Sequence, residues 1–297
     1  MIRFGLCCIF KNEPIRFRRT TAKRLSGMSE HDRLELLSEI CRHNADSLVA
    51  SLQYCKTNGI LSFRINSQIL PLKTHPEWGY QVEDLPAGEQ IVRRFQDAGD
   101  YCRKNNIRTT FHPDQFIVLS SPRADVVESS IRDLAYQAEV AEWVHADVIN
   151  IHAGGVYNDK KSALDRLRKT ITRLPDPIRK RLTLENDDRS YTPQDLFPVC
   201  TELTIPLVYD VHHHRCRPDG LSEEAATALA LKTWDREPLF HVSSPLARQG
   251  KSDFRKHHAY VDPKDIPLFW RNLDITLEVE AKDKELAVLR LKQDLAW

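Results

Sequence analysis

Six short apolar segments are each followed closely by a residue that can bind a metal ion. A single histidine or carboxylate at the end of a strand usually makes only a hydrogen bond, but six consecutive strand ends of this kind favour one shared site. The residues, in chain order, are His112 in FHPDQF, His152 in NIHAGG, Glu185 in LTLENDD, Asp210 and His213 in YDVHHH, His241 in FHVSS and Glu280 in LEVEAK.

Several carboxylates in one buried site need positive charge beside them. Without cations their pKa values rise, and burial costs several kcal/mol per group. Divalent ions remove this conflict, and nitrogen and oxygen donors without thiolate suit Mn²⁺ or Zn²⁺ better than Ca²⁺. The ligands are too many for one ion, so we expect two or three. Metal-assisted hydrolysis is the leading chemistry, and metal-dependent sugar isomerisation remains open because it uses similar ligands.

The elements that position these residues alternate between short strands and longer amphipathic helices. Eight such units in just under 300 residues predict an α/β fold, a single-domain (β/α)8 TIM barrel over residues 1–297. In this fold the C-terminal ends of all strands meet at one mouth. The predicted strands are Ile2–Cys8, Leu61–Ile65, Ile107–Phe111, Val148–Ile151, Leu182–Leu184, Leu207–Tyr209, Leu239–Val242 and Ile275–Val279, and helical spacing links Leu34, Leu37, Cys41, Leu48, Leu52 and Cys55, and also Val127, Ile131, Leu134, Ala138 and Ala141.

The composition sets limits on the class of protein. The 43 Lys and Arg residues almost cancel 42 Asp and Glu residues, which excludes a generally basic nucleic-acid coat or an acidic tail. No apolar run is long enough to span a bilayer, and no G-x-G-x-x-G or P-loop pattern supports a nucleotide cofactor. Seven cysteines without C-x-x-C spacing indicate reduced thiols. We therefore expect a cytoplasmic monomer.

Motifs along nearly the whole chain carry a resemblance to a known family. They are IRFGLCC, HNADSL, FRINSQILPLKTHP, FHPDQF, IHAGG, LENDD, DVHHH, FHVSS, HHAY and VEAKDKE. In order and spacing the sequence resembles the ultraviolet damage endonucleases, whose barrel is related to that of endonuclease IV. The resemblance implies metal-dependent incision of duplex DNA immediately 5′ to cyclobutane dimers, 6-4 photoproducts and, less selectively, abasic sites. It implies Mn²⁺ first, with Zn²⁺, Mg²⁺ and Co²⁺ as alternatives.

The resemblance also implies roles for individual residues. Gln115 and Phe116 correspond to a pair that enters the duplex and occupies the space vacated by the flipped lesion. Glu185, Asp210, His241 and Glu280, the residues implied to be catalytic, correspond to the ligands of one metal; His112 and His152, with Glu185 bridging, to those of a second; and His213 and His258, with Asp210 bridging, to those of a third.

DNA binding needs phosphate contacts, which a net charge of +1 does not provide in general. Two long loops, at 12–33 and 243–263, are predicted after the first and seventh strands. Each contains a basic run, IRFRRTTAKR with Arg18 and Arg19, and ARQGKSDFRKHH. We expect Arg18 and Arg19 to contact DNA. His75 in KTHPEW and Lys282 after Glu280 are further candidates for DNA contacts, although structural hydrogen bonding explains His75 equally well.

Three positions depart from the family pattern. Leu6 occupies the place of a common tyrosine, Leu239 that of a lysine that can be carboxylated, and Phe116 that of another tyrosine. An apolar side chain replaces neither a phenol nor a carbamate, so part of the metal environment or lesion pocket is expected to be missing. Leu6 and Leu239 therefore motivate an alternative, a damage-binding protein with a structural metal site and weakened catalysis.

Overall fold

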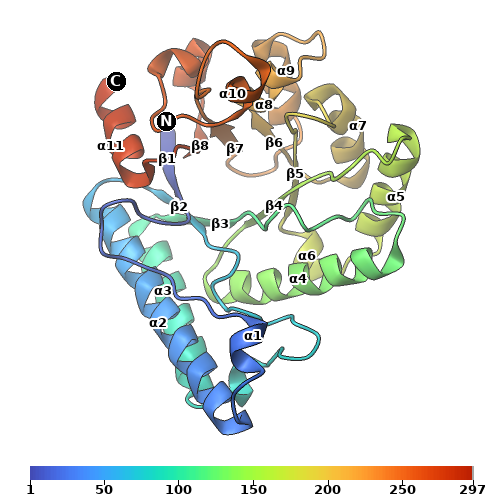
Figure 1. Ribbon diagram of the computed structural model, residues 1–297. Coiled ribbons are helices and arrows are strands. Elements are labelled where there is room, and N and C mark those ends of the chain that lie inside the picture. The colour runs from blue at the N-terminus through green and yellow to red at the C-terminus, as the bar shows by residue number, and fades with distance from the viewer. Residues whose placement is uncertain (296–297) are drawn as a thin grey trace.

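The computed structural model describes residues 1–295 and shows a closed barrel of eight parallel strands, paired in sequence order from β1 to β8 and back to β1. Helices surround the strands (Figure 1). The predicted (β/α)8 barrel is confirmed. The strands are β1 Ile2–Cys7, β2 Ser62–Ile65, β3 Arg108–Phe111, β4 Val148–His152, β5 Leu182–Glu185, β6 Leu207–Asp210, β7 Leu239–Val242 and β8 Ile275–Val279.

Strands β7 and β8 have the predicted bounds, and the other six strands each differ from the prediction by one residue at one end. The first strand stops at Cys7 because Cys8 has a left-handed backbone with φ of 68°. Strands β4, β5 and β6 each continue one residue further than predicted, to His152, Glu185 and Asp210. These three side chains are therefore held by the rigid sheet and not by the loops that follow it.

Helices cover the outside of the barrel, and two predicted loops contain short helices of their own. Helix α1 lies within 12–33, helix α2 begins before that range ends, and α10 lies within 243–263. The helices are α1 Ala22–Leu25, α2 Glu30–Thr57, α3 Gly88–Asn105, α4 Ala124–Trp143, α5 Lys160–Thr172, α6 Asp176–Arg179, α7 Pro193–Leu203, α8 Val211–Cys216, α9 Glu223–Leu231, α10 Lys251–Arg255 and α11 Lys284–Asp294, with 3-10 turns at Val82–Asp84, Pro263–Asp265 and Leu268–Asn272.

The apolar core lies mainly between the barrel and its helices. Side chains of α2 such as Leu48 pack there with outward-facing strand residues such as Phe63 and Leu277. Inside the barrel, a small apolar cluster of Val148, Val208 and Leu239 is partly covered by Trp234. Above this cluster the interior is polar, with buried residues Ser62, Arg64, Thr110, Asn150, Thr183 and Glu278.

This polar interior follows from the alternation of strand side chains, because every second residue of each strand points into the barrel. Near the mouth, the apolar residues of each strand point outward into the core beneath the helices, and the polar residues point into the barrel. The stability of the fold therefore comes largely from the outer layer. No helix in the described part of the chain is long and apolar enough to span a bilayer.

Candidate metal centre

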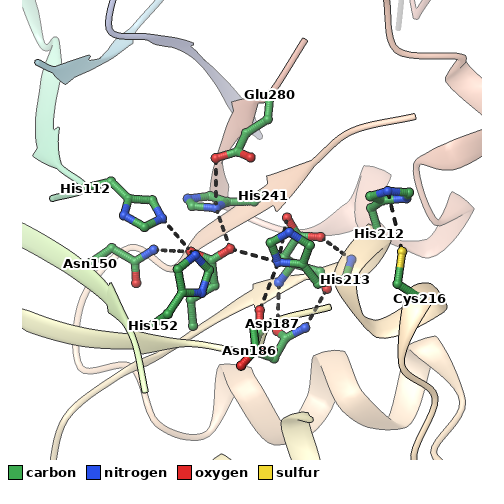
Figure 2. A network of polar contacts seen from close by, with 12 residues as sticks. His112, Asn150, His152, Asn186, Asp187, His212, His213, Cys216, His241 and Glu280 are labelled. Carbon is green, nitrogen blue, oxygen red and sulfur yellow. Dashed lines mark hydrogen bonds and ion pairs between the residues drawn. The ribbon is translucent and has the colours of Figure 1, made fainter. Parts of the chain in front are cut away.

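The mouth of the barrel brings together the histidines and carboxylates that end successive strands. His152, Glu185 and Asp210 are the last residues of β4, β5 and β6. His112 directly follows β3, and His241 lies within β7. Figure 2 shows these histidines gathered together, with Glu280, just beyond β8, directly above His241 in this view. His213 joins them from the first turn of α8, where Asp210 caps its backbone N–H at 2.7 Å.

Glu185 lies at the centre of this arrangement, and its side chain is only 1% exposed. Its Oε2 is 2.9 Å from His112 Nε2 and 4.0 Å from His152 Nε2. Its Oε1 is 3.2 Å from His241 Nδ1 and 3.3 Å from His213 Nδ1. One carboxylate therefore faces four imidazoles, the geometry expected of a bridging ligand.

Three sets of ligand atoms converge closely enough to hold divalent ions. The atoms of each set lie within 4.8 Å of one another. The sets are His112, His152 and Glu185; His112, His241 and Glu280; and Glu185, Asp210 and His213.

Unpaired polar atoms show that these residues suit cations. Glu185 Oε1, Asp210 Oδ2 and His241 Nδ1 are all buried, and none makes a hydrogen bond within the described residues. A buried polar atom without a partner costs about 1–3 kcal/mol, and more when it is charged. Nitrogen and oxygen donors of this kind, with no cysteine among them, are natural ligands of a divalent transition metal.

The electrostatics of the cluster agree with strong coupling between acids and imidazoles. Burial alone would raise the pKa of Glu185, but His241 and His152 outweigh it and hold the pKa well below its usual range. Burial alone would lower the pKa of His241, but Glu185, helped by other carboxylates, raises it well above its usual range. The site is thus built for negative charge matched by nearby positive charge.

Comparison with known proteins agrees with this geometry. A family model described as UV-endonuclease UvdE matches residues 2–297. This chain belongs to the UV-endonuclease family.

Individual relatives support the assignment along the full length. A UV DNA damage endonuclease of Bacillus velezensis is 34% identical, over 100% of this chain and 94% of the relative. The crystal structure of SacUVDE superposes with a TM-score of 0.88 at 28% identity, over 100% of this chain and 98% of that one. Endonuclease IV from Thermus thermophilus shares the fold, with a TM-score of 0.62 at 12% identity over 99% and 97% of the two chains. The resemblance to the ultraviolet damage endonucleases is confirmed.

The structure distinguishes two adjacent histidines of this UV-endonuclease-family chain. His257 Nδ1 lies 3.7 Å from Glu280 Oε2, and its ring centroid is 6.3 Å from that of His213. His258, the predicted ligand, is exposed, and its Nδ1 accepts the backbone N–H of Tyr260 at 3.1 Å. The bridge between Pro245 and His257 fixes this register. The structure therefore places His257, and not His258, beside the cluster.

The residues expected to probe the duplex lie in an exposed loop. Gln115 and Phe116 follow His112 in the loop between β3 and α4, and both are exposed. Phe116 is 77% exposed, which is unusual for a large aromatic side chain. The ring lines a surface cleft together with Leu72 and His75, and its entry into the duplex stays a prediction.

The other residues predicted to contact DNA lie outside the metal cluster. His75 is half-buried, and its Nδ1 accepts the backbone N–H of Glu77 and of Trp78, which is a local structural role. Lys282 and Arg19 are exposed. Arg18 pairs with Glu39 at 2.6 Å.

The two apolar departures from the family pattern occupy different layers of the barrel. Leu6 is fully buried in the outer core, so it faces the helices and not the mouth. Cys7 is the neighbouring first-strand residue whose thiol lies among Arg64, Glu278 and Glu280. Leu239 lies inside the barrel, in the apolar cluster below His241. Neither leucine contributes a ligand atom.

Sequence reasoning missed three buried polar residues that touch the ligands. Asn150 donates from Nδ2 to Glu185 Oε2 at 2.5 Å. Arg64 lies 2.7 Å from Glu280 Oε1 and 3.4 Å from Glu278 Oε2. The alternation of LEVE in β8 was an available signal for Glu278, because it puts Glu278 on the same inward face as Glu280.

Proposed function

We propose that this protein is a metal-dependent DNA repair endonuclease that hydrolyses the phosphodiester immediately 5′ to ultraviolet photoproducts in duplex DNA. Membership of the UV-endonuclease family supports a DNA-cleaving enzyme that acts on UV damage. The single observation that carries the metal dependence is the convergence of three ligand sets at the barrel mouth, two of which share Glu185. Cyclobutane dimers and 6-4 photoproducts are the proposed lesions, and abasic sites are proposed as poorer substrates.

The proposed cofactor is a cluster of two or three divalent ions, with Mn²⁺ as the first choice. His112, His152, His213 and His241 would supply nitrogen, and Glu185, Asp210 and Glu280 would supply oxygen. His257 is added to these proposed ligands because of its approach to Glu280. Bound ions of this kind supply Lewis-acid polarisation of a phosphate and activation of water.

The residues of the chain would hold the substrate and the ligands in place. Arg64 fixes the Glu280 carboxylate from below. Asn150 fixes one oxygen of Glu185, and the hydroxyl of Thr183 in turn donates to Asn150 Oδ1 at 2.9 Å. At the opening, Phe116 can stack in an unpaired step of the duplex while Gln115 offers an amide to exposed base edges.

The basic loop after β1 is the proposed contact for phosphates. Arg19 is exposed and makes no ion pair within the described residues, so its charge is available to DNA. The second basic run is largely neutralised within the protein. Arg248 pairs with Asp262 at 3.0 Å and with Asp265 at 3.1 Å. The first loop is therefore the stronger candidate.

Incision of a defined substrate tests the proposed function. A duplex with one photoproduct and a labelled 5′ end is incubated with the protein and Mn²⁺, and the product length is mapped at nucleotide resolution. We expect one nick immediately 5′ to the lesion, its loss with a chelator and its return with excess Mn²⁺. Tight binding of the irradiated duplex without a nick under any divalent ion would instead support a damage-binding protein. Conversion of an aldose to a ketose without DNA cleavage would support a sugar isomerase.

A further inference from the structure

A second glutamate of β8, Glu278, is enclosed directly below the proposed metal ligands. It is fully buried, and it precedes Glu280 by two residues on the same inward face. Its Oε1 accepts a hydrogen bond from the hydroxyl of Thr110 across the barrel. Its Oε2 lies 3.2 Å from His241 Nε2. None of the three ligand sets includes Glu278, so its carboxylate serves another purpose.

The two ring nitrogens of His241 face different partners. Nδ1 points to the ligand cluster, 3.2 Å from Glu185 Oε1 and 3.5 Å from Glu280 Oε1. Nε2 points down to Glu278. A nitrogen can bind a metal ion only through its lone pair, so an ion on Nδ1 requires the proton on Nε2. Glu278 Oε2 lies 3.2 Å from Nε2, and neither atom makes a hydrogen bond within the described residues, so each is left as an available partner for the other.

The barrel leaves room for this carboxylate and balances its charge. A side chain at Gly5 of β1 would place its Cβ 3.0 Å from Cγ of Glu278, so the glycine permits the close approach. The guanidinium of Arg64 lies 3.4 Å from Glu278 Oε2. Arg64 also has a closer partner in Glu280, at 2.7 Å, so neutralising Arg64 does not by itself require Glu278.

We infer that Glu278 is a positioning residue that holds His241 with its proton on Nε2 and thereby presents Nδ1 to the metal cluster. Carboxylates that accept the second N–H of a metal-binding histidine orient the ring and raise its basicity. The inference rests on the proposed metal site. It adds to that site a buried acid that binds no ion itself.

Ion affinity tests this role independently of catalysis. Mn²⁺ binding is measured by competition with a chelating dye for the parent protein, Glu278→Leu, Glu278→Gln and Ser62→Ala. Glu278→Leu should weaken Mn²⁺ binding by about 10–100-fold at the tightest site that depends on His241. Glu278→Gln keeps an oxygen acceptor and should recover most of the loss. Ser62→Ala removes a buried hydroxyl of the same layer that makes no hydrogen bond within the described residues, so its affinity should stay close to that of the parent.

Nitrogen NMR of the histidine rings provides the second readout. With ¹⁵N-labelled histidine and diamagnetic Zn²⁺, the parent and Glu278→Gln should show His241 with a protonated Nε2 and an ion on Nδ1. The resonances are assigned by comparison with His241→Asn. This measurement does not need Glu278→Leu, so it tests the inference even if that variant does not fold.

The outcomes separate the two proposals. Binding by folded Glu278→Leu as tight as that of the parent, or an ion on Nε2 of His241 in the parent, would overturn the positioning role and leave the metal site intact. A parent protein that binds no divalent ion would overturn the proposed metal dependence itself. A loss in Glu278→Leu that Glu278→Gln restores, with the expected ring protonation, would support the inference.

Discussion

Glu185→Gln is the substitution that should affect incision most for the least change in shape. The amide is nearly isosteric with the carboxylate, but it removes one negative charge from the centre of the cluster. Two of the three ligand sets contain this residue, so both lose an anionic ligand. The neighbouring imidazole nitrogens, at 2.9, 3.2 and 3.3 Å, would then face a neutral group.

The size of the effect follows from these distances. At about 3 Å and an effective dielectric constant of about 20, one pair of unit charges corresponds to about 5 kcal/mol of gross attraction. Burying the charge costs several kcal/mol per ion, which offsets part of the gain from any single pair. Several of the proposed cations would share Glu185, so we expect a net loss of about 4 kcal/mol in transition-state stabilisation, which is about 10³-fold in rate.

Single-turnover incision of the photoproduct duplex at saturating Mn²⁺ measures this loss. Binding to the same duplex should fall by less than about tenfold, because phosphate contacts outside the metal cluster supply much of the affinity. Glu237→Gln is the matched control: Glu237 precedes β7 at the other end of the barrel and accepts from Arg3 at 2.8 Å. Folded Glu185→Gln that cleaves within tenfold of the parent would refute Glu185 as a shared ligand, whatever Glu237→Gln does.

Four further outcomes are expected. His257→Ala should raise the Mn²⁺ concentration needed for incision by about tenfold or more, and His258→Ala should change it less; the opposite order in an ion titration would contradict the placement of His257 beside Glu280. Phe116→Ala should reduce the preference for irradiated over undamaged duplex by about 1–3 kcal/mol in competition binding, whereas Phe116→Tyr should keep it, and equal preference in all three proteins would exclude stacking by this exposed ring. Arg19→Ala should make the dependence of binding on salt less steep by about one unit of slope, while Arg93→Ala on α3 should not; identical slopes would remove the first loop from the DNA contact surface. Mn²⁺ binding near pH 7 should release protons, because carboxylates outweigh burial and raise the pKa values of His213 and His241 well above the usual range, so affinity should fall as the pH falls; calorimetry whose heat is independent of the buffer would contradict this.

The barrel and most of the cluster could be predicted because six of the eight strands are short apolar runs with a histidine or carboxylate at or next to their C-terminal ends. In a closed parallel barrel those ends must meet, so the chemistry of His152, Glu185 and Asp210 follows from their places in the chain. The same rule gave no help in the loop after β7. His257 and His258 are adjacent and chemically identical, and a backbone bridge to Pro245 decides which of them turns inward.

The layer below the ligands was missed for a different reason. The candidate ligands were residues at or next to the ends of strands, whereas Asn150 and Glu278 lie inside β4 and β8. Their alternation with apolar residues puts them on the same inward faces as His152 and Glu280, a signal that strand ends alone do not use. In β1, Leu6 is the residue aligned with the family's tyrosine, but it faces outward, and the neighbouring Cys7 faces the ligands.

The division of the barrel into layers also explains how this chain tolerates so many charges at its centre. Outward-facing residues such as Phe63 and Leu277 stabilise the fold against the helices, so the inward positions need not be apolar. The inward positions can then hold Arg64 between the carboxylates of Glu278 and Glu280, directly beneath the ligands. Because the strands are rigid, each of these side chains has little freedom to move away from its partner. The near-neutral overall charge therefore reflects local pairing of acids and bases and does not argue against a strongly polar site that acts on DNA.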